Sequence, residues 1–118
     1  MKPRISVAED DLALSEALQL LLEDEGYEVE IMLQGEQVRK MHAPLPALLL
    51  LDVWMGGTDG REMCRHLKSQ QATKHLPIIL LSAHNEVAAM AKEAEANDFL
   101  LKPFNINELL ALIEKYVS

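Results

Sequence analysis

Residues 44–52 read Pro-Leu-Pro-Ala-Leu-Leu-Leu-Leu-Asp. The run of apolar residues at 47–51 is too short for a good helix and is typical of a strand covered on both faces. We therefore expect this strand at the centre of a parallel sheet. Asp52 would then lie at the carboxyl end of that strand.

Short apolar runs recur on both sides of this segment and alternate with amphipathic stretches. The run at 27–31 alternates apolar and charged residues, which is typical of a strand at the edge of a sheet. A weaker helical pattern covers 34–41, with Val38 and Met41 as its inward pair. In all, the periodicity predicts strands at 5–8, 27–31, 47–51, 78–81 and 99–101, and helices at 14–22, 34–41, 61–69, 87–94 and 106–117.

Strands that alternate with helices pair in parallel through right-handed crossovers. The expected fold class is therefore α/β, with a doubly wound, open, five-stranded parallel sheet. No repeat, low-complexity tract or Gly/Ser linker interrupts the pattern, so we expect a single domain over residues 1–118.

Composition narrows the classes of function. With 49% hydrophobic and 25% charged residues, the chain is typical of a soluble globular domain. Its formal net charge of −8 opposes binding to nucleic acid or to an anionic membrane surface by this chain. The sequence shows neither a secretory signal nor a run long enough to span a membrane, so a cytoplasmic location is expected. Cys64, the single cysteine, is interpreted as a small buried hydrophobic residue.

Acidic residues follow two of the expected strands. In a sheet of this kind, ligands bind beyond the carboxyl ends of the strands. Glu9, Asp10 and Asp11 follow the first strand and Asp52 follows the third, so four carboxylates should meet at one edge. Asp11 is explained as a helix cap. The others would repel one another without a cation. Their oxygen ligands indicate Mg²⁺, Mn²⁺ or Ca²⁺, and a half-open site completed by water suits Mg²⁺ best.

A hydroxyl and an ammonium group are expected at the same edge. Ser82 ends the fourth strand, and Lys102 ends the fifth, between Leu101 and Pro103. An ammonium opposite a metal-bound carboxylate can hold an anion between the two groups. These residues together predict a site for a phosphoryl group, with Asp52 as the nucleophile.

Four motifs in this order are similar to those of one known family, over essentially the whole chain. The motifs are Val7-Ala8-Glu9-Asp10-Asp11, Leu50-Leu51-Asp52-Val53-Trp54-Met55 followed by Asp59-Gly60, Leu81-Ser82-Ala83, and Asp98-Phe99-Leu100-Leu101-Lys102-Pro103-Phe104. In these motifs the chain resembles the receiver domains of two-component response regulators, which implies a flavodoxin-like (βα)5 fold with strand order 2-1-3-4-5.

The resemblance implies a role for each matching residue. Asp52 would accept a phosphoryl group from a histidine kinase, a phosphotransfer protein or a small phosphodonor. Ser82 and Lys102 would bind the phosphoryl group, and Phe99 would act as an aromatic switch. The implied ligands of Mg²⁺ are Glu9, Asp10, Asp52 and the backbone carbonyl of Trp54. Trp54 and His84 would tune the lifetime of the phosphoryl group.

The resemblance also implies an output. Phosphorylation would draw in Ser82 and let Phe99 turn inward, remodelling the face made by the helix at 87–94, the strand at 99–101 and the last helix. That face would signal to a partner protein or to an effector domain in a bacterial cytoplasm, from a monomer or a phosphorylation-dependent dimer. The chain would be a signalling domain that assists its own phosphorylation and dephosphorylation, not an enzyme.

Three positions depart from the pattern of the family. Gly56 stands where proline is usual, which should loosen the loop after Asp52. Glu95 stands where glycine is usual, so the turn before the last strand should differ. Phe99 lacks the hydroxyl of the more common tyrosine.

Two other functions remain open from the sequence. A phosphatase of the haloacid-dehalogenase type also uses a strand-end aspartate, Mg²⁺ and a lysine, but it needs a second acid two residues after its nucleophile. This chain has Trp54 there. A receiver-like interaction module without phosphorylation would be expected to lose an acid, the hydroxyl or the lysine of the site, and this chain keeps them all.

Overall fold

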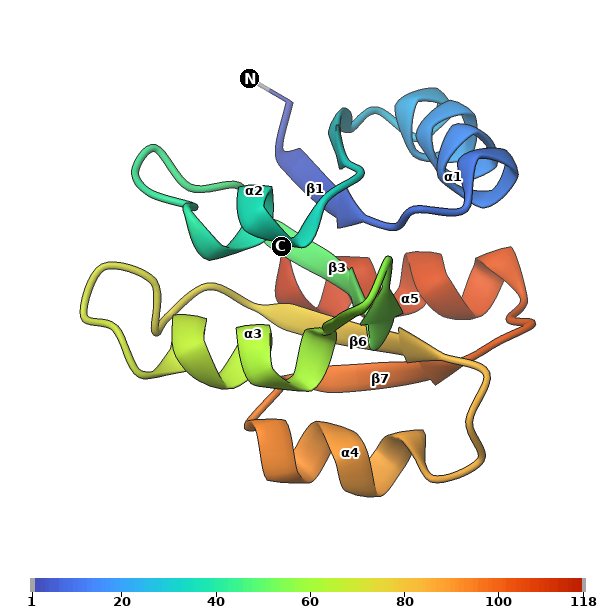
Figure 1. Ribbon diagram of the computed structural model, residues 1–118. Coiled ribbons are helices and arrows are strands. Elements are labelled where there is room, and N and C mark those ends of the chain that lie inside the picture. Colours follow the sequence, from blue (N-terminus) through green and yellow to red (C-terminus); the bar gives the residue numbers. More distant parts are fainter. Residues whose placement is uncertain (1, 118) are drawn as a thin grey trace.

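The computed structural model describes residues 2–117, which form a five-stranded parallel sheet with helices on both faces (Figure 1). The sheet order is β2-β1-β3-β6-β7, which confirms the expected topology. Its strands are β1 (Arg4–Ala8), β2 (Glu28–Met32), β3 (Leu48–Asp52), β6 (Ile78–Ser82) and β7 (Asp98–Leu101). The helices are α1 (Leu12–Asp24), α2 (Gly35–Arg39), α3 (Gly60–Lys68), α4 (Val87–Ala94) and α5 (Ile106–Tyr116).

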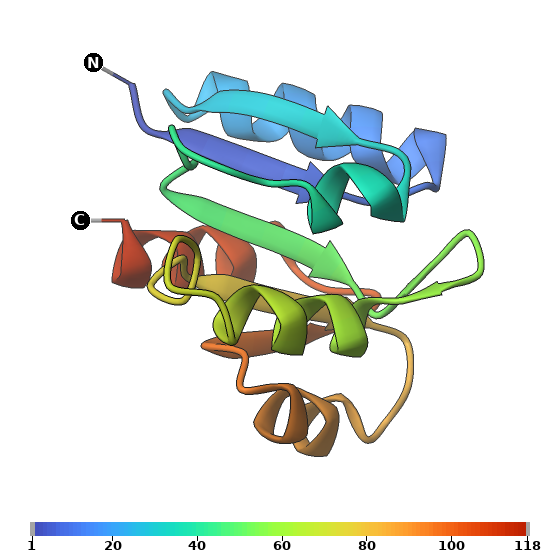
Figure 2. The ribbon, with the colours of Figure 1, turned by 60° about the vertical axis from the view of Figure 1, so that its left-hand side comes forward.

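The leucine-rich strand β3 is the middle of the sheet, and all five of its residues are buried. Its side chains alternate between two hydrophobic cores. Leu48 and Leu50 pack with residues of α1 and α5 on one face, whereas Leu49 and Leu51 pack with residues of α2, α3 and α4 on the other. Figure 2 shows the sheet between these two layers of helices. The continuous apolar run of β3 therefore contributes side chains to both hydrophobic cores.

Strand β2 forms one edge of the sheet, as its alternating sequence predicted. Glu28 and Glu30 are exposed, while Val29 and Ile31 are half-buried. The preceding helix α1 ends shortly before Gly26, whose φ of 97° is readily adopted only by glycine. Local sequence signals therefore account for the end of α1 and for the half-exposed pattern of β2.

Two elements differ from the expected pattern. Helix α2 has only five residues, shorter than the predicted 34–41; Val38 is buried within it, and the half-buried Met41 lies beyond its end. An unexpected antiparallel hairpin joins β4 (Trp54–Met55) to β5 (Thr58–Asp59). Its turn is Gly56-Gly57, both with positive φ, which is a favoured sequence for a two-residue hairpin turn.

The turn before β7 contains Glu95, a second of the three positions that depart from the family pattern. Glu95 follows helix α4 with φ of 62°, in the left-handed region that favours glycine. Glu95 therefore adopts the left-handed backbone conformation that glycine would adopt at this position. Among residues 2–117, no helix is both long and apolar enough to cross a membrane.

Candidate functional site

Four strands bring the predicted site residues together at the carboxyl ends of the parallel strands. The parallel register places Ala8 beside Leu51 and Ser82 beside Leu101. The residues that end or follow these strands therefore lie at the same end of the sheet, where the strand arrowheads point in Figure 2. They are Glu9, Asp52, Ser82 and Lys102. Both chain termini lie toward the opposite edge in that view.

Three carboxylates form a cluster at this edge. Glu9, Asp10 and Asp52 each offer a carboxylate oxygen within 4.8 Å of the others. Glu9 and Asp52 are almost completely buried, with 1% and 7% of their surface exposed, whereas Asp10 faces solvent. An all-oxygen set that is open on one side matches the preference of Mg²⁺, which keeps several water ligands. The donor set therefore fits the predicted ion.

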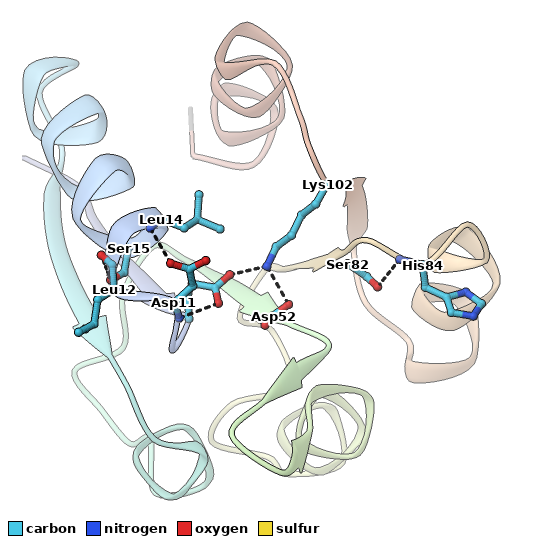
Figure 3. A network of polar contacts seen from close by, with 9 residues as sticks. Asp11, Leu12, Leu14, Ser15, Asp52, Ser82, His84 and Lys102 are labelled. Atoms are coloured by element: carbon cyan, nitrogen blue, oxygen red, sulfur yellow. Dashed lines mark hydrogen bonds and ion pairs between the residues drawn. The ribbon is translucent and has the colours of Figure 1, made fainter.

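Asp11 has a separate role, as predicted. Its side chain accepts a hydrogen bond from the backbone N–H of Leu14 at 3.2 Å and caps helix α1 (Figure 3). Its own backbone N–H donates to Oε2 of Glu9 at 3.2 Å. The start of α1 thus helps to hold Glu9 in place.

Lys102 connects two carboxylates that lie far apart in the sequence. Its Nζ donates to Oε1 of Glu9 at 2.5 Å and to Oδ1 of Asp52 at 3.1 Å (Figure 3). Burial of the ammonium acts to lower its pKa, but the hydrogen bond to Glu9 and the charges of both acids outweigh that effect and raise it. Lys102 is therefore held in its charged form at neutral pH.

The carboxyl group of Asp52 has an unusual proton affinity. Its pKa is raised from 3.8 to about 6, first by burial and then by the negative charge of Glu9. Lys102 opposes this rise through its charge and its hydrogen bond. Asp52 is consequently a buried carboxylate that is mostly ionised at pH 7. The positive charge of Lys102 offsets only part of the unfavourable effects of burial and of the Glu9 charge.

The side chains of Ser82 and Phe99 are not part of the hydrogen-bond network that joins Lys102 to Glu9 and Asp52 in residues 2–117. The Oγ of Ser82 accepts a hydrogen bond from the backbone N–H of His84 at 3.0 Å, and Figure 3 shows it apart from Asp52 and Lys102. Within residues 2–117, the Oγ of Ser82 makes no hydrogen bond to Asp52 or Lys102, although the backbone carbonyl oxygen of Ser82 accepts from the backbone N–H of Lys102 at 2.7 Å. Phe99 is 38% exposed on β7. Both side chains thus lie outside the contact network of Asp52.

A family model described as the response regulator receiver domain matches residues 5–114. The chain belongs to this family. The phosphate regulon transcriptional regulatory protein PhoB of Rhizobium meliloti is 39% identical over 97% of this chain and 52% of the relative. The chain spans about half the length of the curated relatives it matches.

Solved structures of response regulators share the fold of this receiver domain. A putative response regulator from Chloroflexus aurantiacus superposes with a TM-score of 0.90 at 33% identity, covering 99% of this chain and 98% of that one. The response regulator TrrA from Thermotoga maritima, in complex with Mg²⁺ and BeF, gives a TM-score of 0.84 at 30% identity, covering 98% of this chain and 99% of that one.

The receiver domain also depends on contacts of Asp59 and Gly60 that the sequence did not predict. A Cβ atom added to Gly60 would collide with the backbone carbonyl oxygen of Asp52, so only glycine lets α3 begin this close to β3. Asp59 caps α3 by accepting from the N–H of Arg61 at 2.9 Å, and it pairs with the Arg61 guanidinium at 2.8 Å. The Asp59-Gly60 pair was visible in the sequence, but its contacts required the structure.

The β4–β5 hairpin of the receiver domain lies beside the acids. A Cβ atom added to Gly56 would be 3.3 Å from Oδ2 of Asp10. Trp54, at the start of the hairpin, is 62% exposed. Gly56 is therefore part of a regular hairpin against the acid cluster, and the expected loosening of this loop stays a prediction.

Proposed function

We propose that this receiver domain accepts a phosphoryl group on Asp52 from the phosphohistidine of a histidine kinase or phosphotransfer protein, or from a small phosphodonor. The observation that carries the proposal is the contact of Lys102 with both Glu9 and Asp52, next to an acid cluster suited to a metal ion. A purely structural ion pair would not need the third, exposed acid, Asp10.

The transfer itself needs an ionised nucleophile. An Oδ of Asp52 attacks the phosphorus atom, the P–N bond of the phosphohistidine breaks, and its electron pair leaves with the imidazole. With a pKa of about 6, Asp52 is mostly ionised at pH 7. Lys102 supplies a fixed positive charge for the oxygens of the incoming group.

The residues that would hold Mg²⁺, or Mn²⁺ in its place, are Glu9, Asp10, Asp52 and the backbone carbonyl of Trp54. When bound, the ion supplies positive charge that offsets the carboxylates and the phosphoryl oxygens. The carboxylate cluster supports this assignment, and the Mg²⁺ named in the complex of TrrA is consistent with it.

The phosphorylated state would change the hydrogen bonding of the switch residues. Phosphorylation replaces one negative charge with about two and adds acceptor oxygens. The hydroxyl of Ser82 then donates to a phosphoryl oxygen, and Phe99 turns into the space that Ser82 leaves. The face made by α4, β7 and α5 changes shape as a result, and His84 and Trp54 affect how long the phosphoryl group lasts.

The output of the domain belongs to the same proposal. We infer that residues 1–118 form one receiver domain in a bacterial cytoplasm, and that it signals to a partner protein or an effector domain. It does so as a monomer or as a dimer formed on phosphorylation. The name of the Rhizobium relative, a transcriptional regulatory protein, supports an output on transcription through such an effector.

Trp54 provides the test, because it is the single tryptophan and is exposed beside the site. Its fluorescence should change when Mg²⁺ is added and again with the phosphoryl mimic beryllofluoride. Both changes should disappear in Asp52→Asn. The matched control is Asp11→Asn, which removes a neighbouring charge but keeps the helix cap, and it should retain both responses. An unresponsive wild-type protein would contradict the proposal.

A further inference from the structure

His84 joins the end of β6 to the start of α4 through three hydrogen bonds. Its backbone N–H donates to Oγ of Ser82 at 3.0 Å (Figure 3). Its ring Nδ1 accepts from the backbone N–H of Glu86 at 3.1 Å, and its carbonyl oxygen accepts from the N–H of Val87 at 3.1 Å. One residue is therefore bonded to the hydroxyl of Ser82 on one side and to the first turn of α4 on the other.

The imidazole of His84 takes the place of an ordinary helix cap. Helix α4 begins after Glu86, whose own side chain makes no capping hydrogen bond. The N–H groups at the start of a helix lack partners within it, and acceptors outside the helix stabilise them. The ring and the carbonyl of His84 supply such acceptors for the N–H groups of Glu86 and Val87. The hold of the chain on the start of α4 thus depends on His84.

The hydroxyl of Ser82 has to leave its present contact in order to reach a phosphoryl group on Asp52. The residue is 7% exposed, and its Oγ is bonded to the N–H of His84 and not to Asp52 or Lys102 within residues 2–117. When Oγ turns toward Asp52, the N–H of His84 loses this acceptor or has to follow it. Either movement disturbs the cap of α4, because the same residue makes both contacts.

We propose that His84 is a positioning residue that couples the rotation of the Ser82 hydroxyl to the first turn of α4. The cause of that rotation rests on the proposed function of Asp52. In the unphosphorylated protein, the ring of His84 holds the turn at 84–87 and keeps the Ser82 hydroxyl directed away from Asp52. When the hydroxyl turns, the first turn of α4 loosens. Coupling of this kind is reciprocal, so a weaker cap makes the rotation of Ser82 easier.

Amide exchange with water, measured by NMR on the metal-free protein, tests the coupling without any phosphoryl group. Ser82→Ala removes the acceptor of the His84 N–H. The amide of Glu86 should then exchange about two- to tenfold faster, the range for the loss of one hydrogen bond, although Ser82 does not contact it. Asn85→Ala, a change at the exposed residue between His84 and Glu86, should leave that rate unchanged. Acceleration confined to the amide of His84 would overturn the coupling.

The affinity for beryllofluoride with Mg²⁺, followed by Trp54 fluorescence, tests the reverse direction. His84→Ala should bind beryllofluoride about two- to tenfold more tightly than wild type, because one hydrogen bond no longer holds the turn. His84→Asn should restore the wild-type affinity, since an asparagine side chain can accept from the N–H two residues further on. In the Ser82→Ala background, His84→Ala should have no effect, because there is no hydroxyl to release.

Two results of the binding experiment would overturn the proposal. One is a His84→Ala protein that binds beryllofluoride no more tightly than wild type. The other is a gain in affinity that persists in the Ser82→Ala background, because it would come from a direct contact of the ring with the phosphoryl site. If the wild-type protein does not bind beryllofluoride at all, the proposed function of Asp52 is contradicted, and the amide exchange of the metal-free variants still decides whether Ser82 and His84 are coupled.

Discussion

Replacing Asp52 with asparagine should make the metal-free protein more stable at neutral pH. The Asp52 carboxylate is buried, faces the charge of Glu9 and is only partly compensated by Lys102. Its pKa is raised from 3.8 to about 6, so the folded protein holds this proton more tightly than the unfolded chain does. Asparagine keeps the shape and can still accept from Lys102, but it carries no charge to bury.

The size and the sign of the effect follow from the pKa. One pKa unit corresponds to about 1.4 kcal/mol, so ionisation of Asp52 costs the folded state about 3 kcal/mol at pH 7 and above. Because the folded pKa is raised, this cost appears as the pH rises from 3.8 through about 6 and is absent at lower pH. The advantage of Asp52→Asn should therefore shrink below about 1 kcal/mol at pH 4.

Urea denaturation in metal-free buffer at pH 7.5 and pH 4 measures this advantage directly. At pH 7.5 the midpoint of Asp52→Asn should lie about 1 to 3 M above that of wild type, given ordinary slopes for a domain of this size. Asp59→Asn is the opposite control. Arg61 lowers the pKa of Asp59 through a hydrogen bond, so removing that charge should destabilise the protein slightly, by about 0.2–1 kcal/mol.

Two results would show that the buried charge of Asp52 does not destabilise the folded protein. One is an Asp52→Asn protein that is no more stable than wild type at pH 7.5 without metal. The other is a gain in stability that stays the same at pH 4, because a gain of that kind would come from packing instead of charge. Either result would mean that the acid cluster does not raise the free energy of the folded state.

Other consequences of the same structure can be measured separately. Lys102→Met should raise the pKa of Asp52 further, by about 1 to 3 pH units above its value in the wild type, in a carboxyl ¹³C NMR titration; an unchanged pKa would show that the ion pair has no effect. Glu95→Gly should stabilise the protein by about 0.5–1 kcal/mol in urea, since Glu95 has positive φ, and a lower midpoint would count against that backbone conformation. Cys64 is buried, and its pKa is raised to about 11 by burial, so a thiol reagent at pH 8 should modify it only after guanidinium chloride unfolds the chain. Rapid modification of the folded protein would contradict that burial.

Most of the fold could be predicted from the sequence because its strongest signals are local. The apolar run before Asp52 specified the central strand, and the alternation of Glu28 and Glu30 with apolar residues specified the edge strand. The β4–β5 hairpin was missed, since strands of two residues have no periodicity to detect. Its Gly56-Gly57 turn was the one available signal.

The candidate site was predictable in its members but not in its contacts. Strand ends placed Glu9, Asp52 and Lys102 at one edge, because parallel strands share their carboxyl ends. Which acid pairs with Lys102, and how far burial shifts the pKa of Asp52, depends on distances between residues up to 93 positions apart. The contact of Gly60 with the Asp52 carbonyl likewise arises only when α3 packs against β3.

The proposed function depends on the claim that Asp52 accepts a phosphoryl group, and intact-protein mass spectrometry detects that group as an added mass. The protein would be incubated with Mg²⁺ and acetyl phosphate or phosphoramidate, and in parallel with a phosphorylated histidine phosphotransfer protein. We predict one adduct with the mass of a single phosphoryl group, which requires Mg²⁺ and is absent in Asp52→Asn. A wild-type protein that stays unmodified with every donor, or an adduct that persists in Asp52→Asn, would contradict the claim.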